Sequence, residues 1–342
     1  MAVSDRGAAP QAAEPTSPSA TPPALIALDW GTSSLRASLM ARGPDGHGLV
    51  VEETAFPWGI MATPEGDFAK ALDIATGDWT RRHPGLPMIA AGMIGSAQGW
   101  QEVPYLPCPA GAGDLVATLA AQPPVPGTAL RIVPGVRQGG ELPDVMRGEE
   151  TQIVGALELY PSLWQQSLLV LPGTHSKWVR IRRGRIEGFT TYLTGELFAL
   201  LSRHSILGRP AMEAGAPPDR PLSRAAFERG VSVTLRAPSR GITSLLFSTR
   251  SLVLSGGLDA IDSLDYLSGL LIGDEIRAAR TDAPAGVPIA VIGASGLSQR
   301  YDFALSLAGI TGVPLISGAA TTGLWRIASG LSSDNPSRES LS

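Results

Sequence analysis

The sequence contains one cysteine, Cys108, among its 342 residues. A single thiol forms neither an intrachain disulfide nor a thiolate metal cluster, which fits a reducing compartment such as the cytoplasm. The four histidines are far apart in the chain and include no close-spaced pair, so zinc held by protein side chains is not expected. Any metal ion that acts here should therefore arrive with a substrate.

Long apolar runs are also missing, because the stretch LFALLSRHSILG is interrupted by Arg203 and His204. No segment reaches the length that crosses a bilayer, and we expect no membrane partner. The net charge is −4, so the concentrated basic face that binds nucleic acid is not expected either. A bound phosphate would have to be held by local geometry.

What is present is a long chain, 44% hydrophobic, which is enough for two α/β lobes. Residues 1–23 are rich in Ala, Pro, Ser and Thr and lack the apolar block of a signal peptide, so we expect a disordered tail there. The expected lobes cover residues 24–165 and 166–330, and a flexible tail covers residues 331–342.

One supersecondary unit occurs twice in the chain. Three strand-like segments separated by short turns predict an antiparallel meander over residues 24–56. The same design returns over residues 167–193 and leads into a helix that begins at Thr194. Because strands and helices alternate after each meander, we expect mixed sheets covered by helices, with a cleft between two lobes.

The first turn, residues 31–34, follows a strand that ends in Asp29 and Trp30. The backbone N–H groups of Gly31, Thr32 and Ser33 can converge on one point and bind an anion. Asp29 beside them is a candidate for holding Mg²⁺ through water. An ordinary β-turn with a solvated aspartate is the alternative.

The second turn, residues 173–176, again follows an apolar strand, and it contains Gly173, Thr174 and His175. Two such turns that face each other across a cleft would hold the phosphates of a nucleotide from both sides. His175 is a candidate phosphate donor, proton acceptor or simple turn residue. Lys177 is either a further phosphate donor or a solvated lysine at the strand edge.

A third turn, here called the adenosine turn, covers residues 293–296 between a strand and a helix. Gly293 and Gly296 let a flat base or a ribose approach the backbone and the helix N-terminus. Such a turn is a weak signal when it stands alone.

The order of the three turns resembles the superfamily of sugar kinases, actin and heat-shock chaperone ATPases. The segments IALDWGTSSLRA, AGMIGSAQGW, VMRGEETQIVGA, LPGTHSKWV, YLSGLLIGDEI and IGASGLSQRY together resemble the 2-dehydro-3-deoxygalactonokinase family from about Leu25 to the last helix. The resemblance implies a two-lobe actin-like ATPase (ribonuclease H-like) fold with a duplicated βββαβαβα core. It also implies ATP and Mg²⁺ as cofactors and transfer of phosphate to the 6-hydroxyl of 2-dehydro-3-deoxy-D-galactonate, a small sugar acid.

The catalytic base has to be sought outside the second turn, because many related sugar kinases place an aspartate there and this chain has Pro-Gly-Thr-His. Glu149 and Glu150 open a predicted helix, where the ionised form of a carboxylate is favoured. Adjacent helical residues point about 100° apart, so only one of them faces the cleft. We assign Glu150 as the base and Glu149 as a substrate acceptor, with Glu196 as an outside candidate. The alternative is that both only complement the helix dipole.

Arg147, beside these glutamates, is a candidate for a two-point contact with the substrate carboxylate. The loop that contains Gly95, Ser96 and Trp100 should approach the sugar, with Trp100 either covering it or packing in the core. Arg36 is assigned to the same set of substrate contacts.

Two other kinds of function compete with this interpretation. One is a kinase for another sugar acid or a ketose, and the other is an ATPase or sensor of the same fold that transfers phosphate to no sugar. Serine-hydrolase and P-loop interpretations are disfavoured because their G-x-S-x-G and G-x-x-x-x-G-K-[ST] motifs are absent. A homodimer is left open.

Overall fold

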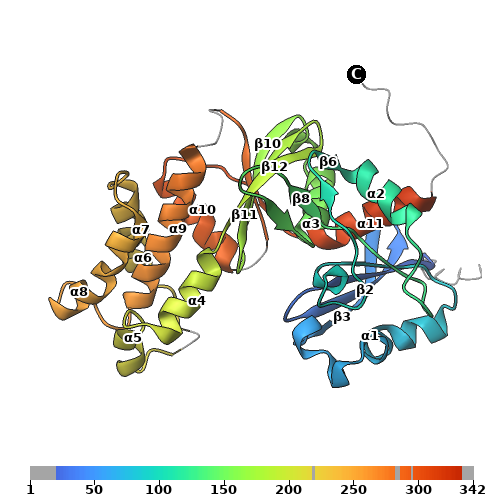
Figure 1. Ribbon diagram of the computed structural model, residues 1–342, viewed down its shortest axis with the longest axis horizontal. Coiled ribbons are helices and arrows are strands. Elements are labelled where there is room, and N and C mark those ends of the chain that lie inside the picture. Colours follow the sequence, from blue (N-terminus) through green and yellow to red (C-terminus); the bar gives the residue numbers. More distant parts are fainter. Residues whose placement is uncertain (1–20, 218–219, 282–285, 294–295, 333–342) are drawn as a thin grey trace, which may run out of the picture.

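The structure is a computed structural model, and it describes residues 21–217, 220–281, 286–293 and 296–332. Most of both expected tails, and two residues of the adenosine turn, lie outside these ranges. The chain forms two large mixed sheets with helices around and between them (Figure 1).

The first sheet has the strand order β3-β2-β1-β4-β7. Its central strand β1 pairs antiparallel with β2 and parallel with β4, and β2 pairs antiparallel with β3, as the predicted meander requires. These strands and the helix α1, which packs on the sheet, are β1 (Pro23–Trp30), β2 (Leu35–Arg42), β3 (Gly48–Phe56), α1 (Phe68–Arg82), β4 (Met88–Ala91) and β7 (Leu130–Ile132).

The second sheet repeats this arrangement in the order β14-β13-β10-β11-β12-β6. Its central strand β10 pairs antiparallel with β11 and parallel with β13. The predicted duplication is therefore confirmed. The strands are β6 (Ala110–Gly111), β10 (Gln166–Leu171), β11 (Ser176–Arg182), β12 (Arg185–Tyr192), β13 (Ile289–Ile292) and β14 (Leu315–Ile316).

A small third sheet was not expected from the sequence. It has the order β5-β8-β9 and is built from β5 (Leu106–Pro107), β8 (Val136–Gln138) and β9 (Asp144–Met146). The apolar segment ALRIVPGV, residues 129–136, divides between β7 and β8, which belong to different sheets. Strands of two or three residues carry too little alternation to be recognised in a sequence.

Two helices, α3 (Glu149–Leu159) and α11 (Ala319–Ser332), cross between the large sheets (Figure 1). They approach closely because glycines stand at the crossing. A Cβ atom on Gly155 would lie 1.9 Å from the carbonyl oxygen of Ala319, and one on Gly323 would lie 1.9 Å from that of Thr151. Each helix ends one repeat of the unit, so their contact ties the two repeats together.

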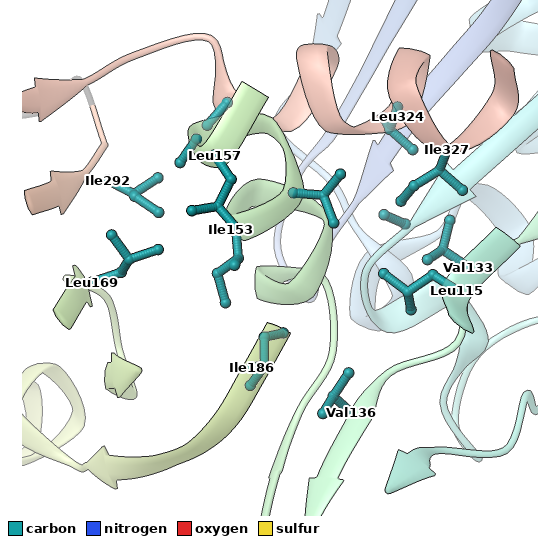
Figure 2. Packing of buried hydrophobic residues seen from close by; sticks show 14 of the residues in the cluster. Leu115, Val133, Val136, Ile153, Leu157, Leu169, Ile186, Ile292, Leu324 and Ile327 are labelled. Carbon is teal, nitrogen blue, oxygen red and sulfur yellow. The ribbon is translucent and has the colours of Figure 1, made fainter. Parts of the chain in front are cut away.

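The core continues from one sheet to the other through these helices. Figure 2 shows Ile153 and Leu157 of α3 together with Leu324 and Ile327 of α11. The central strands are covered on both faces. Leu169 of β10 faces this shared core, whereas its neighbours Leu168 and Val170 face a separate core under α9 and α10. Such strands read as continuous apolar runs because both faces are buried.

The remaining helices lie mainly on the second sheet's side of the molecule (Figure 1). They are α2 (Ala112–Ala121), which lies near α11 instead, and α4 (Thr194–His204), α5 (Arg209–Glu213), α6 (Arg224–Leu235), α7 (Ile242–Leu246), α8 (Ser248–Leu254), α9 (Ser263–Thr281) and α10 (Gly296–Leu307). Among the described residues, none of the helices combines the length and apolarity that crossing a membrane requires.

Candidate active site

The first turn is closed by a hydrogen bond from the backbone N–H of Gly31 to the carbonyl of Ser34, at 2.9 Å. The carbonyls of Gly31 and Thr32 accept from the backbone of the short helical turn at residues 60–62. Within the described residues, the N–H groups of Thr32 and Ser33 donate to no backbone or side-chain acceptor. These two donors are therefore free to bind an anion.

Asp29, at the end of β1, lines a cavity of about 240 Å³ to which both large sheets contribute. Arg36 stands opposite Asp29 in the antiparallel register of β1 and β2, and Gly293 comes from the second sheet. Burial raises the pKa of Asp29, Arg36 lowers it, and the charge of Glu149 raises it further. A cation bound beside this carboxylate would favour its ionised form.

The second turn rests against the start of α4. The N–H of Glu196 donates to the carbonyl of Thr174 at 2.9 Å, and a Cβ atom on Gly195 would lie 2.4 Å from the carbonyl oxygen of Gly173. The Nε2 atom of His175 lies 2.5 Å from a carboxylate oxygen of Glu196, with both side chains about half exposed. This contact fixes the imidazole and leaves Nδ1 for another partner.

Lys177 is not the solvated strand-edge lysine of the alternative interpretation. Its side chain is only 5% exposed, and its Nζ atom lies 3.4 Å from Oε1 of Glu149. Glu149 also acts electrostatically on Asp29. The structure thus brings the end of β1, the start of α3 and the residue after the second turn together at one place.

The two glutamates of α3 have the opposite orientation to the one expected. Glu150 is fully buried: Oε2 accepts from the N–H of Gly148 at 2.7 Å, and Oε1 accepts from the hydroxyl of Thr151 at 3.0 Å. Burial, followed by the charge of Glu149, raises the pKa of Glu150 to about 8. Glu149 is 24% exposed and is the carboxylate that reaches Lys177. Both carboxylates accept a backbone N–H at the helix start, Glu149 from Arg147 at 3.0 Å and Glu150 from Gly148, so the two residues differ in burial.

Arg147 lies buried behind these glutamates. Its guanidinium stacks over the ring of Tyr105 at 4.2 Å and donates through one nitrogen to the carbonyl of Val103 at 2.6 Å. Its Nε and Nη1 atoms have no hydrogen-bond partner within the described residues, and neither has the buried hydroxyl of Ser96. A Cβ atom on Gly95 would lie 2.8 Å from Nη1. Three expected substrate contacts therefore form one cluster with unused donors.

Two other expected substrate contacts lie elsewhere. Trp100 stacks on Phe68 with the ring centroids 6.1 Å apart and packs against the core of the first sheet, as its alternative interpretation proposed. Arg36 lies beside Asp29 and 3.6 Å from Glu53, in the cavity at the first turn.

A larger cavity of about 820 Å³ extends from the second turn between α4, α9 and α10. Gly173 and Gly296 line it, as do several residues that sequence reasoning missed, including Phe198, Leu222, Ser268 and Arg300. Arg300 stands one helical turn after Gly296 on α10 and could have been suspected for that reason. Phe198 and Leu222 carry no local signal, because they come together only through the packing of separate helices.

Among the residues that the structure describes, no group of three His, Cys, Asp or Glu side chains could hold a metal ion. Asp29 lies at the end of β1, next to the free backbone N–H groups of the first turn. A single carboxylate suits an Mg²⁺ ion that keeps most of its waters and also binds phosphate oxygens. The chain's residues thus fit a metal that enters with a phosphate-bearing substrate.

Two mixed sheets with the same strand connections, each with a turn directly after its central strand, define a protein of the actin-like ATPase fold. Similarity to known proteins narrows this class. The sequence profile of the 2-keto-3-deoxy-galactonokinase family matches residues 29–327, so the chain belongs to that family.

Individual relatives agree with this membership. A protein of Rhizobium meliloti (strain 1021), named a probable 2-dehydro-3-deoxygalactonokinase, is 38% identical over 83% of this chain and 89% of its own. The 2-dehydro-3-deoxygalactonokinase of Escherichia coli (strain K12) is 36% identical over 83% of this chain and 90% of its own. A crystal structure from Sinorhizobium meliloti, assigned to the same enzyme, is 36% identical and superposes with a TM-score of 0.78 over 90% of this chain and 97% of that one.

Proposed function

We propose that the chain transfers the γ-phosphate of ATP to the 6-hydroxyl of 2-dehydro-3-deoxy-D-galactonate, giving ADP and the 6-phosphate in a cytoplasmic route of galactonate breakdown. The observation that carries the proposal is the meeting of Asp29, Glu149 and Lys177 at the junction of the two repeats. It joins a candidate metal ligand, a candidate base and a phosphate donor.

The nucleotide occupies the 820 Å³ cavity, with its base and ribose near Gly296 and its phosphates at the second turn. The free N–H groups of Thr32 and Ser33 approach the phosphates from the first turn. Asp29 would hold Mg²⁺ through water, and charge on the transferred phosphate would be neutralised there. Arg36 adds positive charge beside Asp29, in the 240 Å³ cavity.

The sugar acid binds on the other side of Glu149. Its carboxylate meets the unused Nε and Nη1 donors of Arg147 and the hydroxyl of Ser96. A buried guanidinium with two unused donors costs free energy until an anion binds it, and a carboxylate matches its fork. Gly95 packs directly against the guanidinium, where a Cβ atom would lie 2.8 Å from Nη1.

In the reaction, the 6-oxygen of the sugar bonds to the γ-phosphorus, and the bond from that phosphorus to the β–γ bridging oxygen breaks. The hydroxyl proton passes to Glu149, whose carboxylate lies 3.4 Å from Nζ of Lys177. Glu150 holds the backbone that presents Glu149. Positioning and charge supply most of the catalysis, so the base contributes a smaller share.

The test is a coupled ADP-release assay over a panel of 2-keto-3-deoxy acids that includes the C4 epimer and a ketose without a carboxylate. The proposal expects the galactonate derivative to have the highest kcat/KM and the ketose to be poor. A ketose preferred over every acid would favour the alternative kinase, and equal ADP release without any sugar would favour a non-transferring ATPase.

A further inference from the structure

A carboxylate lies buried beneath the second turn, outside the site described so far. Glu275 of α9 is 2% exposed. It accepts hydrogen bonds from the indole N–H of Trp178 and the hydroxyl of Tyr301, each at 2.7 Å, and from the hydroxyl of Thr194. Three donors from three different elements therefore converge on one side chain.

The hydrogen bonds continue to the turn itself. The hydroxyls of Tyr301 and Ser176 lie 2.8 Å apart. Because Tyr301 donates its proton to Glu275, Ser176 is the donor to the Tyr301 oxygen. The chain of bonds thus runs from the last residue of the second turn, through α10, to α9.

Each donor belongs to an element that carries part of the proposed nucleotide site. Ser176 and Trp178 lie on β11, directly after the second turn. Thr194 begins α4 and precedes Gly195, which contacts that turn. Tyr301 lies on α10, which begins at Gly296 of the adenosine turn. Thr194 and Tyr301 also line the 820 Å³ cavity, and α4, α9 and α10 lie together in Figure 1.

Burying a carboxylate costs desolvation free energy, so packing alone does not explain a glutamate at this position. Burial raises the pKa of Glu275, and the hydrogen bonds from Thr194, Trp178 and Tyr301 oppose that rise. An apolar side chain of similar volume would fill the same space without the desolvation cost. What it could not do is hold three elements at fixed separations through directional bonds.

We propose that Glu275 is a positioning residue for the nucleotide, which sets the distance between the second turn and the start of α10 by holding Trp178, Thr194 and Tyr301. The inference rests on the proposed binding of ATP in the adjoining cavity. Glu275 contacts neither substrate, and it acts through the turns that do.

The expected result is a selective loss of nucleotide affinity. In Glu275→Gln, the amide oxygen can still accept from Trp178, but an amide N–H₂ takes the place of the oxygen that accepts from Thr194 and Tyr301. The bonds to these two hydroxyls must therefore reverse direction or break. The KM for ATP and the Kd for ADP should rise about tenfold, because the second turn and α10 are no longer held at the separation that fits the nucleotide. The KM for the sugar acid should stay within about twofold. Tyr301→Phe removes one hydroxyl and should give a smaller rise in the same two constants.

The matched control is Asp274→Asn, which changes the adjacent carboxylate of the same helix. Asp274 pairs with Arg277, away from the cluster, and this variant should keep both KM values. Kinetics give the two KM values, calorimetry gives the Kd for ADP, and thermal unfolding shows that each variant is folded. If Glu275→Gln does not fold, Tyr301→Phe decides the question.

The proposal is overturned if the variants lose thermal stability but keep the KM for ATP, or if the KM values for ATP and sugar acid rise equally. Placement of the nucleotide is tested separately by Ser268→Trp, which fills the cavity without touching Glu275. ADP binding that survives Ser268→Trp would refute that placement, whatever the result for Glu275.

Discussion

Replacing Glu150 by Gln should stabilise the protein, and more so as the pH rises. Glu150 is fully buried, and its pKa is raised to about 8 from a reference value of 4.5. The folded protein therefore keeps a proton that the unfolded chain releases between these two values. Stability falls as the pH rises through this window, and the loss is complete above the folded pKa.

The size of this stability loss follows from the difference between the folded and the reference pKa of Glu150. One pKa unit corresponds to about 1.4 kcal/mol, so the penalty at pH 7 is on the order of 3 kcal/mol and approaches about 5 kcal/mol above pH 8. Glutamine carries no charge at any pH. Its oxygen can still accept from the N–H of Gly148, and its amide can donate to the Thr151 hydroxyl, so the local hydrogen bonds survive.

The assay is urea unfolding of wild type and Glu150→Gln at about pH 4.5, 7 and 8.5. We expect nearly equal free energies of unfolding at the lowest pH and a growing advantage for the variant above it. The control is Glu149→Gln, which leaves the buried ammonium of Lys177 without its carboxylate partner and should destabilise. An equal effect of Glu150→Gln at all three pH values, or a loss of stability at pH 8.5, would refute the reasoning.

Three further predictions concern catalysis. Glu149→Gln should lower kcat by about 10²–10⁴-fold, whereas Glu150→Gln should keep kcat within about threefold. Steady-state kinetics that find the reverse would restore Glu150 as the base. Arg147→Lys should raise the KM for the sugar acid by about 10–100-fold and leave the KM for ATP unchanged. Lysine keeps the positive charge but lacks the planar pair of N–H donors that matches a carboxylate. An equal rise in both KM values would contradict a carboxylate contact. Asp29→Asn should strongly reduce turnover at limiting Mg²⁺ while circular dichroism shows the fold intact, and normal turnover would remove Asp29 from the mechanism.

The sequence allowed the fold to be predicted in unusual detail because its main signals are local. The two meanders are marked by apolar strands and glycine-rich turns, and the central strands read as apolar runs because both faces are covered. The crossing of α3 and α11 could not be predicted from the sequence, because the reason for Gly155 and Gly323 is visible only once the two helices are in contact.

Sequence motifs identified the residues of the candidate site but not the directions in which their side chains point. Asp29, Lys177 and the glutamates of α3 were identified from motifs, yet periodicity could not decide which glutamate turns back to the Gly148 N–H. Trp100 was ambiguous because an aromatic ring can cover a sugar or pack in a core, and Phe68, on which it stacks, is distant in the sequence. Glu275 gave no signal, because its three partners are 26 to 97 residues away.

The most direct test of the central claim is ³¹P NMR of a reaction that contains the protein, MgATP and 2-dehydro-3-deoxy-D-galactonate. The proposed function predicts one equivalent of ADP for each equivalent of a phosphate monoester, with proton coupling that identifies carbon 6 as the site. ADP accompanied by inorganic phosphate alone, or a monoester at another carbon, would contradict it.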